Sequence, residues 1–269
     1  MIDAESALAP FLDRPGKAAI LIDFDGTLAP IVDDPQAARP LDGAADLLAE
    51  LARTYGVVGV LSGRPVSFLA PFMPPGVVLS GLYGLEVVQG DGTRSDHPHS
   101  GAWREVVADV VRCSADRGPA GMGVETKGLS LTLHYRTRPD LARDVDVWAR
   151  QQAARSGLVT RPARMSVELH PPIDTDKGSA TEQLAERAEA EAVCFVGDDR
   201  GDLPAYDALD RLAARGVHTL RVAVGSDESP DELVRRADLV LDGPTAVLHF
   251  LRRLAGAAAD GAGAEAAGV

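Results

Sequence analysis

The sequence predicts an α/β protein, built on a doubly wound parallel sheet that is interrupted by an inserted α+β domain. Short apolar runs alternate with amphipathic segments near both ends of the chain, as in 19–22, 57–61 and 192–196. Continuous apolar runs of this length are typical of strands buried on both faces. In the middle of the chain, pairs of short strands each preceded by a helix replace this alternation. We therefore expect two domains.

Turn signals and composition set the expected domain boundaries. The core is predicted over residues 1–88 and 171–255, and the inserted cap over 89–170, starting at the hairpin-type turn Gln89–Gly92. Residues 256–269 are almost wholly alanine, glycine and acidic residues. Because this segment has little apolar bulk to bury, we expect a disordered tail.

In the first core segment, apolar spacing defines each element in turn. Leu47, Leu48 and Leu51 recur at helical spacing, and Pro65 suits the first turn of a helix. The expected order is a strand ending at Ile22, a helix over 41–55, a strand over 57–61, a helix over 67–72 and a strand from 77.

The same spacing rules predict the helices and strands of the inserted segment and of the second core segment. In the insert we expect helices over 103–116 and 141–156, and strands over 122–126, 130–135, 158–159 and 165–169. In the second core segment we expect a helix to 190, a strand over 192–196, a helix to 215, a strand over 218–224, a short helix from 229, a strand over 239–241 and a helix over 244–254.

Bulk composition limits the classes of partner. The formal net charge of −13 disfavours a nucleic-acid or anionic-membrane binder, because such proteins need basic patches. A phosphorylated substrate would then need locally placed cations and a metal. Two cysteines imply no disulfide framework, and the amino terminus lacks the basic start and apolar core of a signal peptide. We expect a cytoplasmic protein.

The first apolar strand ends in Asp23-Phe24-Asp25-Gly26-Thr27. Alternate residues of an extended chain point the same way, so Asp23 and Asp25 are expected to share one site at the carboxyl end of the strand. Two close carboxylates repel unless a cation lies between them, and hard oxygen ligands suit Mg²⁺. The plainer alternative is an acidic turn after a core strand.

Two further strand and helix junctions carry groups suited to binding a phosphoryl oxygen. Ser62 follows a buried strand, and its hydroxyl together with the backbone N–H groups of Gly63 and Arg64 could bind an anion. An N-cap serine is the alternative, and both roles are compatible. Lys177 opens a helix, where the helix dipole favours anions, so a bound phosphate would explain it. A salt bridge to Asp174 or Asp176 is the alternative.

A third buried strand ends in three acids within five residues, Asp198, Asp199 and Asp202. Any one of them could cap a loop. Together with the aspartates of the first strand, the cluster indicates a divalent cation.

These four motifs, Asp-x-Asp-Gly-Thr, Ser-Gly-Arg, Lys-Gly and Gly-Asp-Asp-x-x-Asp, follow one another in the order seen in haloacid dehalogenase-like (HAD) phosphatases, which the chain resembles over its whole core. The resemblance implies a Rossmann-like HAD core. It further implies Asp23 as nucleophile, Asp25 as general acid and base, and Ser62 and Lys177 as groups that bind the phosphoryl oxygens. Mg²⁺ would bind Asp23, the backbone carbonyl of Asp25 and Asp198, with Asp199 and Asp202 in support.

The inserted segment is similar in size and α/β type to a C2B-type cap, and the chain resembles trehalose-6-phosphate phosphatases along most of its length. The resemblance rests on Asp23 to Pro35, on Val124 to Ser130, on His134-Tyr135-Arg136, and on Glu168 ahead of Pro171. Two positions depart from the family pattern. Tyr83 replaces a histidine, and Gly201 stands where threonine is more familiar.

The resemblance implies a phosphosugar substrate. Glu125, Lys127 and Glu168 on the cap and Arg64 on the core would contact its hydroxyl groups; alternatively, Glu125 and Lys127 form an exposed strand pair. The implied reaction is Mg²⁺-dependent hydrolysis of trehalose 6-phosphate, in functional pairing with a trehalose-6-phosphate synthase. The alternatives are another phosphosugar or a trehalose-like pseudo-disaccharide phosphate, a sugar phosphomutase, or a non-catalytic phosphate sensor or receiver-like domain.

Overall fold

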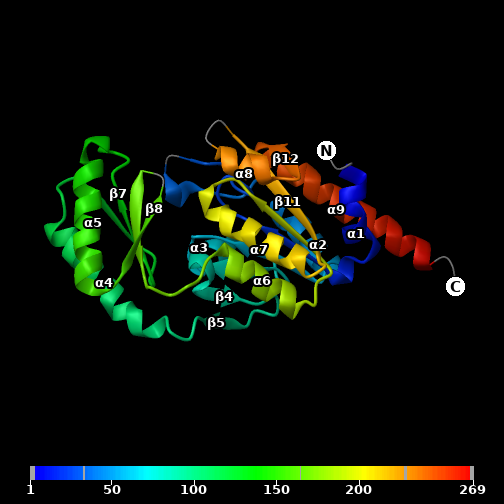
Figure 1. Cartoon of the computed structure of the whole chain (residues 1–269), viewed down its shortest axis with the longest axis horizontal. Helices are drawn as coiled ribbons and strands as arrows, with labels where there is room; N and C mark the ends of the chain where they lie inside the picture. The colour runs from blue at the N-terminus through cyan, green and yellow to red at the C-terminus, as the bar shows by residue number, and fades with distance from the viewer. Residues whose placement is uncertain (1–3, 33, 164, 227–228, 267–269) are drawn as a thin grey trace. The chain divides into compact units, whose positions relative to one another are not determined.

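The computed structural model describes residues 4–32, 34–163, 165–226 and 229–266. Asp33, within the stretch Asp23 to Pro35 that carries the resemblance, and residues 267–269 of the expected tail lie outside the described residues. The chain forms two compact units, one of residues 1–95 with 175–269 and one of residues 96–174 (Figure 1). The first unit carries the parallel sheet, so it is the core; the second is the inserted α+β unit.

The core sheet has eight strands in the order β12-β11-β10-β1-β2-β3-β4-β5. Neighbours from β12 to β3 run parallel, and β4 turns back antiparallel to β3. The strands are β1 (Ala18–Ile22), β2 (Val57–Leu61), β3 (Val78–Gly81), β4 (Glu86–Val88), β5 (Arg94–Asp96), β10 (Ala192–Gly197), β11 (His218–Gly225) and β12 (Leu239–Asp242).

Helices cover both faces of this sheet, as a doubly wound fold requires. Ile20 and Ile22 of β1 pack into one apolar cluster, while Ala19 and Leu21 pack into the cluster on the opposite face. The first cluster contains side chains of α1 (Ala4–Asp13), α2 (Ala44–Thr54), α3 (Val66–Leu69) and α9 (Gly243–Ala266). The second contains those of α6 (Lys177–Arg187), α7 (Leu203–Ala214) and α8 (Asp231–Arg236).

The register of the central strands brings their carboxyl ends to one level. Ile22, the last residue of β1, is aligned with Val196 of β10 and Val60 of β2. The pairing extends one residue further, since the Asp23 N–H donates to the Val196 carbonyl at 2.9 Å. The polar residues that follow β1, β2 and β10 therefore lie at the same edge of the sheet.

The inserted unit is a four-stranded antiparallel sheet in the order β6-β7-β9-β8. Its elements are α4 (Arg104–Arg117), β6 (Gly123–Thr126), β7 (Leu131–His134), α5 (Ala142–Ser156), β8 (Val159–Ala163) and β9 (Ser166–His170). Leu131 and Leu133 of β7 and Val145 and Ala149 of α5 are buried in its apolar cluster. The unit thus has a core of its own.

Short 3-10 helices occupy several of the connections. They are η1 (Pro15–Lys17), η2 (Pro35–Ala37), η3 (Ala70–Phe72), η4 (Leu82–Gly84), η5 (Gly101–Trp103), η6 (Pro139–Leu141) and η7 (Arg200–Asp202).

Three features differ from the sequence prediction. Helix α1 was not expected. The turn at Gln89 joins β4 to β5 within the core sheet, so the two units meet in the chain at 95/96 and 174/175, later than the expected boundaries. The expected disordered tail is instead helical as far as Ala266, because alanine has the highest helix propensity. Across the described residues, no helix has the length and apolar character needed to span a membrane.

Candidate active site

Lys177 lies at the centre of the polar cluster at the sheet edge and pairs with two aspartates. Its Nζ donates to Asp23 Oδ1 at 2.5 Å and to Asp202 Oδ1 at 2.6 Å, and all three side chains are buried. Asp23 follows Leu21 by two residues, so it points to the face that α6 covers. The fold therefore brings together a carboxylate and a lysine that are 154 positions apart in the chain.

The start of α6 fixes the position of this lysine. Asp176 is the N-cap residue, and its side chain accepts the Ser179 N–H at 2.7 Å in a reciprocal capping box. The alternative salt bridge to Asp174 or Asp176 is not what pairs Lys177: Asp176 caps the helix, and Asp23 and Asp202 accept from the lysine. A strong N-cap and a buried ion pair are both needed here, because the helix dipole does not favour a cation at this end.

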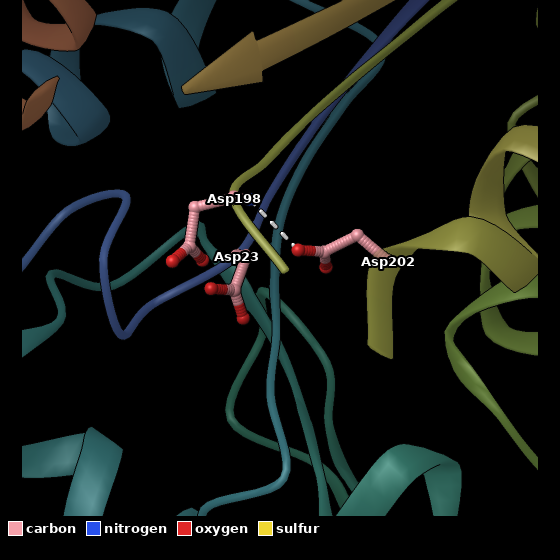
Figure 2. Close-up of side chains that lie close together, drawn as sticks. All are labelled: Asp23, Asp198 and Asp202. Atoms are coloured by element: carbon pink, nitrogen blue, oxygen red, sulfur yellow. Dashed lines mark hydrogen bonds between the residues drawn. The ribbon is translucent and has the colours of Figure 1, made fainter. Parts of the chain in front are cut away.

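Asp202 ties the loop after β10 to the lysine. Its second oxygen, Oδ2, accepts the backbone N–H groups of Asp198 at 2.8 Å and Asp199 at 3.0 Å. Figure 2 shows the first of these bonds, with the Asp202 carboxylate facing the backbone at Asp198. Both carboxylate oxygens of Asp202 are thus used to hold the site together, and this orients Asp198.

Asp23, Asp198 and Asp202 form a group that could hold a metal ion. Each offers a carboxylate oxygen, and these atoms lie within 4.8 Å of one another (Figure 2). Asp198 Oδ1 is buried and has no hydrogen-bond partner among the described residues. A buried oxygen of this kind fits a hard cation, which would supply the missing partner.

Gly26 makes room for Asp198 at this point. Its φ is +81°, and an ideal Cβ would lie 2.0 Å from Asp198 Oδ2. The glycine of the first motif therefore serves both a left-handed turn and a close approach to the metal-site carboxylate.

Burial and mutual repulsion shift the pKa values of the cluster. Burial raises the pKa of Asp23 well above its usual value, the Lys177 charge lowers it, and Asp202 and Asp198 raise it further. Burial, followed by Asp202 and Asp199, raises the pKa of Asp198 to about 8. Burial also lowers the pKa of Lys177, but the carboxylates of Asp202, Asp23 and Asp199 outweigh this and raise it. The cluster has more negative charge than its lysine neutralises, which favours binding a cation.

Asp25 does not share its partner with Asp23. Strand β1 ends at Ile22, and Phe24 turns into the apolar cluster that contains α2 and α9. The Asp25 carboxylate is paired with the Arg64 guanidinium, at 2.8 Å from Nε to Oδ2 and 2.7 Å from Nη2 to Oδ1. Phe24 lies on the face opposite Asp23, as alternation predicts, and the two carboxylates have separate cationic partners.

The loop after β2 holds Ser62 and leads into α3. Ser62 is buried, and its Oγ accepts the Arg64 backbone N–H at 3.1 Å. We expected this N–H to bind a phosphoryl oxygen, but the serine side chain takes it in a local turn. The helix N-cap is Pro65, and Glu86 Oε2 accepts the Val66 N–H at 2.9 Å. Sequence reasoning missed the capping role of Glu86, which is distant in the chain and has no local signal.

Tyr83, just after β3, contacts the loop that follows β2. Leu82 and Tyr83 have φ values of +50° and +58°, and their N–H groups donate to the carbonyls of Arg64 at 2.9 Å and Ser62 at 3.0 Å. The phenol lies against Gly63, where an ideal Cβ would be 2.6 Å from Tyr83 Oη. Strained backbone of this kind is retained where the surroundings determine it, often beside functional sites.

The remaining predicted metal residue, Asp199, stands outside the acidic group. Its side chain is exposed and Oδ1 accepts the Gly201 N–H at 2.7 Å, which caps η7. Its carboxylate is therefore used in the loop, while its charge still acts on Asp198 and Lys177.

The predicted sugar-contacting residues of the inserted unit fall into two pairs. Glu168 is buried on β9, accepts the Ser130 hydroxyl at 2.7 Å, and lies 3.9 Å from the Lys127 Nζ. Glu125 Oε2 lies 2.8 Å from His134 Nε2 on the neighbouring strand. Glu125 thus pairs with His134, and Lys127 lies near Glu168.

A parallel core with an inserted α+β unit, and a lysine–aspartate cluster at the carboxyl ends of its strands, define the HAD-like phosphatase fold. A haloacid dehalogenase-like hydrolase from Bacteroides thetaiotaomicron has this fold at 15% identity, with a TM-score of 0.60 over 88% of this chain and 99% of that one. The chain belongs to the trehalose-phosphatase family, whose model matches residues 21–238.

Individual members of this family show the same relation. The trehalose-phosphate phosphatase of Mycobacterium leprae is 33% identical over 253 residues, which cover 89% of this chain and 58% of the relative. The chain thus spans less than two thirds of that relative's length. The C-terminal domain of the C. albicans trehalose-6-phosphate phosphatase is 25% identical, with a TM-score of 0.74 over 93% of this chain and 95% of that one.

Proposed function

We propose that this protein hydrolyses trehalose 6-phosphate to trehalose and phosphate, with Mg²⁺ as cofactor and an aspartyl phosphate as intermediate. The observation that carries the proposal is the buried Asp23, hydrogen-bonded to Lys177 and within ligand distance of Asp198, in a chain of the trehalose-phosphatase family. Relatives named for trehalose-phosphate dephosphorylation support the choice of substrate.

In the first step, an oxygen of Asp23 attacks phosphorus, and the bond from phosphorus to the sugar oxygen breaks. Asp25 supplies the proton that the leaving sugar oxygen needs. The products are trehalose and a phosphorylated Asp23. The fixed positive charge of Lys177, with the Ser62 hydroxyl, would stabilise the negative charge on the phosphoryl oxygens.

In the second step, water attacks the phosphorus of the aspartyl phosphate. Asp25, deprotonated by the first step, takes the proton from that water, and the bond to Asp23 breaks. Phosphate leaves and both aspartates return to their starting states, so the cycle balances.

Asp23, Asp198 and the backbone carbonyl of Asp25 would hold Mg²⁺, with Asp202 and Asp199 supporting them. When bound, the ion supplies positive charge beside the transferring phosphoryl group. The buried, unpartnered Asp198 Oδ1 is the feature that supports this assignment.

The inserted unit would recognise the sugar. Glu168 with Lys127, and Glu125, which is two residues from Lys127 in the sequence, offer charged hydrogen-bonding groups of the kind that distinguish hydroxyl patterns. A trehalose-6-phosphate synthase would supply the substrate. The cytoplasmic location expected from the sequence stays a prediction.

The test is phosphate release from trehalose 6-phosphate, sucrose 6-phosphate, glucose 6-phosphate and mannose 6-phosphate, each with Mg²⁺ or EDTA. Asp23→Asn is the blank, and Asp42→Asn, an exposed carboxylate on the same unit, is the matched control. We expect strong preference for trehalose 6-phosphate, no release from Asp23→Asn or with EDTA, and full activity in Asp42→Asn.

Release from an aryl phosphate but from none of the four sugars would overturn the substrate and retain the chemistry. Trehalose-like pseudo-disaccharide phosphates would then be tested next, with Tyr83 as the first residue to vary. Equal activity of Asp23→Asn and the parent chain would overturn the mechanism.

A further inference from the structure

Arg64 makes a bidentate salt bridge with Asp25. Its Nε and Nη2 donate to the two oxygens of the Asp25 carboxylate at 2.8 and 2.7 Å, and its Nη1 donates to the Pro35 carbonyl at 2.7 Å. Side-on pairing of a guanidinium with a carboxylate fixes both the position and the plane of the carboxylate. The planar guanidinium of Arg64 therefore holds the Asp25 carboxylate in one orientation.

The guanidinium is itself held in place. Its carbon lies 4.3 Å from the centre of the Phe68 ring, which packs edge-on against Phe24 at 5.9 Å between centroids. The arginine backbone is anchored as well, through its N–H to Ser62 Oγ and its carbonyl to the Leu82 N–H. A planar cation stacked on a fixed aromatic ring has little conformational freedom, so it can orient a neighbouring side chain with a small loss of conformational entropy.

The pairing leaves Asp25 able to react. A carboxylate has about four lone-pair sites, and a side-on arginine occupies one on each oxygen. The Asp25 side chain is 32% exposed, whereas that of Arg64 is 11% exposed. The acid is accessible while the group that orients it is mostly covered.

We propose that Arg64 is a positioning residue that acts through Asp25, rather than a sugar contact. This rests on the proposed function, in which Asp25 transfers the proton to and from the reacting oxygens. The sequence resemblance gave Arg64 a place among the sugar-binding residues, but its Nε, Nη1 and Nη2 each donate to Asp25 or to the Pro35 carbonyl.

A double-mutant cycle tests the proposal on the full chain with Mg²⁺ and trehalose 6-phosphate. The variants are Arg64→Ala, Asp25→Asn and the double variant, with kcat/KM as the readout. We expect Arg64→Ala to lower kcat/KM by about 10²-fold, since a small misplacement of a reacting group has that effect. In the Asp25→Asn background the same change should alter kcat/KM by less than about twofold, because the residue it orients is already disabled.

Arg64→Lys guards against a folding artefact. Arg64→Lys keeps the positive charge but cannot make the two-point contact with Asp25. It should therefore unfold at the same denaturant concentration as the parent, yet lose most of the activity that Arg64→Ala loses. Added guanidinium ion should restore part of the activity of Arg64→Ala and none of that of Asp25→Asn. A purely structural role of Arg64 would give no such rescue.

A second comparison separates acid positioning from sugar binding. Butyl phosphate carries no sugar but has a poor leaving group, whereas p-nitrophenyl phosphate has a leaving group that needs no proton. Arg64→Ala should slow the first markedly more than the second.

The outcomes distinguish the two proposals. An equal loss from Arg64→Ala in both backgrounds, with butyl phosphate unaffected, would overturn the positioning role and restore the sugar contact. If Asp25→Asn itself keeps full activity, the proposed role of Asp25 fails, and the positioning role fails with it.

Discussion

The two units each contain a lysine beside buried carboxylates, but the two clusters are built differently. In the core, Lys177 hydrogen-bonds two aspartates at 2.5 and 2.6 Å. In the inserted unit, Lys127 Nζ lies 3.9 Å from Glu168 Oε1, beyond hydrogen-bond length, while the Ser130 hydroxyl donates to that same oxygen at 2.7 Å.

The difference lies in how far the buried carboxylates depend on the lysine beside them. Removing Lys177 would leave two buried carboxylates without their donor, and this is strongly unfavourable. Glu168 keeps its serine donor whatever Lys127 does. We infer that Lys177 is required to pair the buried carboxylates of the core, whereas Glu168 does not depend on Lys127 alone for a donor.

The largest expected effect is that of Lys177→Met. It should lower the free energy of unfolding by about 3–5 kcal/mol, because uncompensated buried charge remains, and it should abolish phosphate release. Urea unfolding measures the first and an activity assay the second. Lys17→Met is the matched control, since Lys17 pairs with Glu189 on the surface, and it should change neither quantity appreciably. Equal urea midpoints for the two variants would show that the core cluster is not structural.

The next effect comes from Gly26→Ala, which places a Cβ on Asp198. Gly92→Ala is its control, because Gly92 also has a positive φ, +86°, but nothing lies within 4 Å of its ideal Cβ. Both should lose about 1 kcal/mol from backbone strain. We expect the rise in melting temperature on adding Mg²⁺ to disappear only in Gly26→Ala, as that rise reports metal affinity. Retention of the rise in both variants would argue against Asp198 as a ligand.

Lys127→Met should affect binding more than stability. We expect the free energy of unfolding to fall by about 1 kcal/mol. The KM for trehalose 6-phosphate should rise by about 10- to 100-fold from a lost charged hydrogen bond. Hydrolysis of p-nitrophenyl phosphate should not change. The control is Arg143→Met, an exposed cation on the same unit. A stability loss as large as that of Lys177→Met would remove the distinction between the clusters.

The smallest effect is a pH dependence within the inserted unit. Burial, followed by the Arg161 charge, lowers the pKa of His170 below 6.5. The unfolded chain then takes up this proton before the folded one, so the free energy of unfolding should decline as pH falls through about 6.5. The decline should be reduced in His170→Gln when urea unfolding is followed from pH 8 to pH 5. An identical pH profile in the two proteins would exclude His170 as its source.

Three of the four core motifs could be predicted because they lie at strand ends. Asp23, Ser62 and Asp198 all follow apolar runs, and parallel strands bring their carboxyl ends together. Local patterns could not give the pairings. That Lys177 bonds Asp23 depends on residues 154 positions apart, and that Glu86 caps α3 depends on the turn at Tyr83. Such contacts follow from the assembled sheet.

The local pattern placed Asp23 and Asp25 side by side but could not give their partners. Asp23 pairs with Lys177, and Asp25 pairs with Arg64. The tail differs for a separate reason, because low apolar content was taken as a sign of disorder where alanine propensity supports a helix.

The most direct test of the central claim is to trap the covalent intermediate. The protein is mixed with trehalose 6-phosphate and Mg²⁺, quenched in acid within the first turnover and analysed by peptide mass spectrometry. We expect one added phosphoryl group on the peptide that contains Asp23, and none in Asp23→Asn. Rapid turnover of the substrate with no phosphoryl group on that peptide, or with one on a different residue, would contradict it.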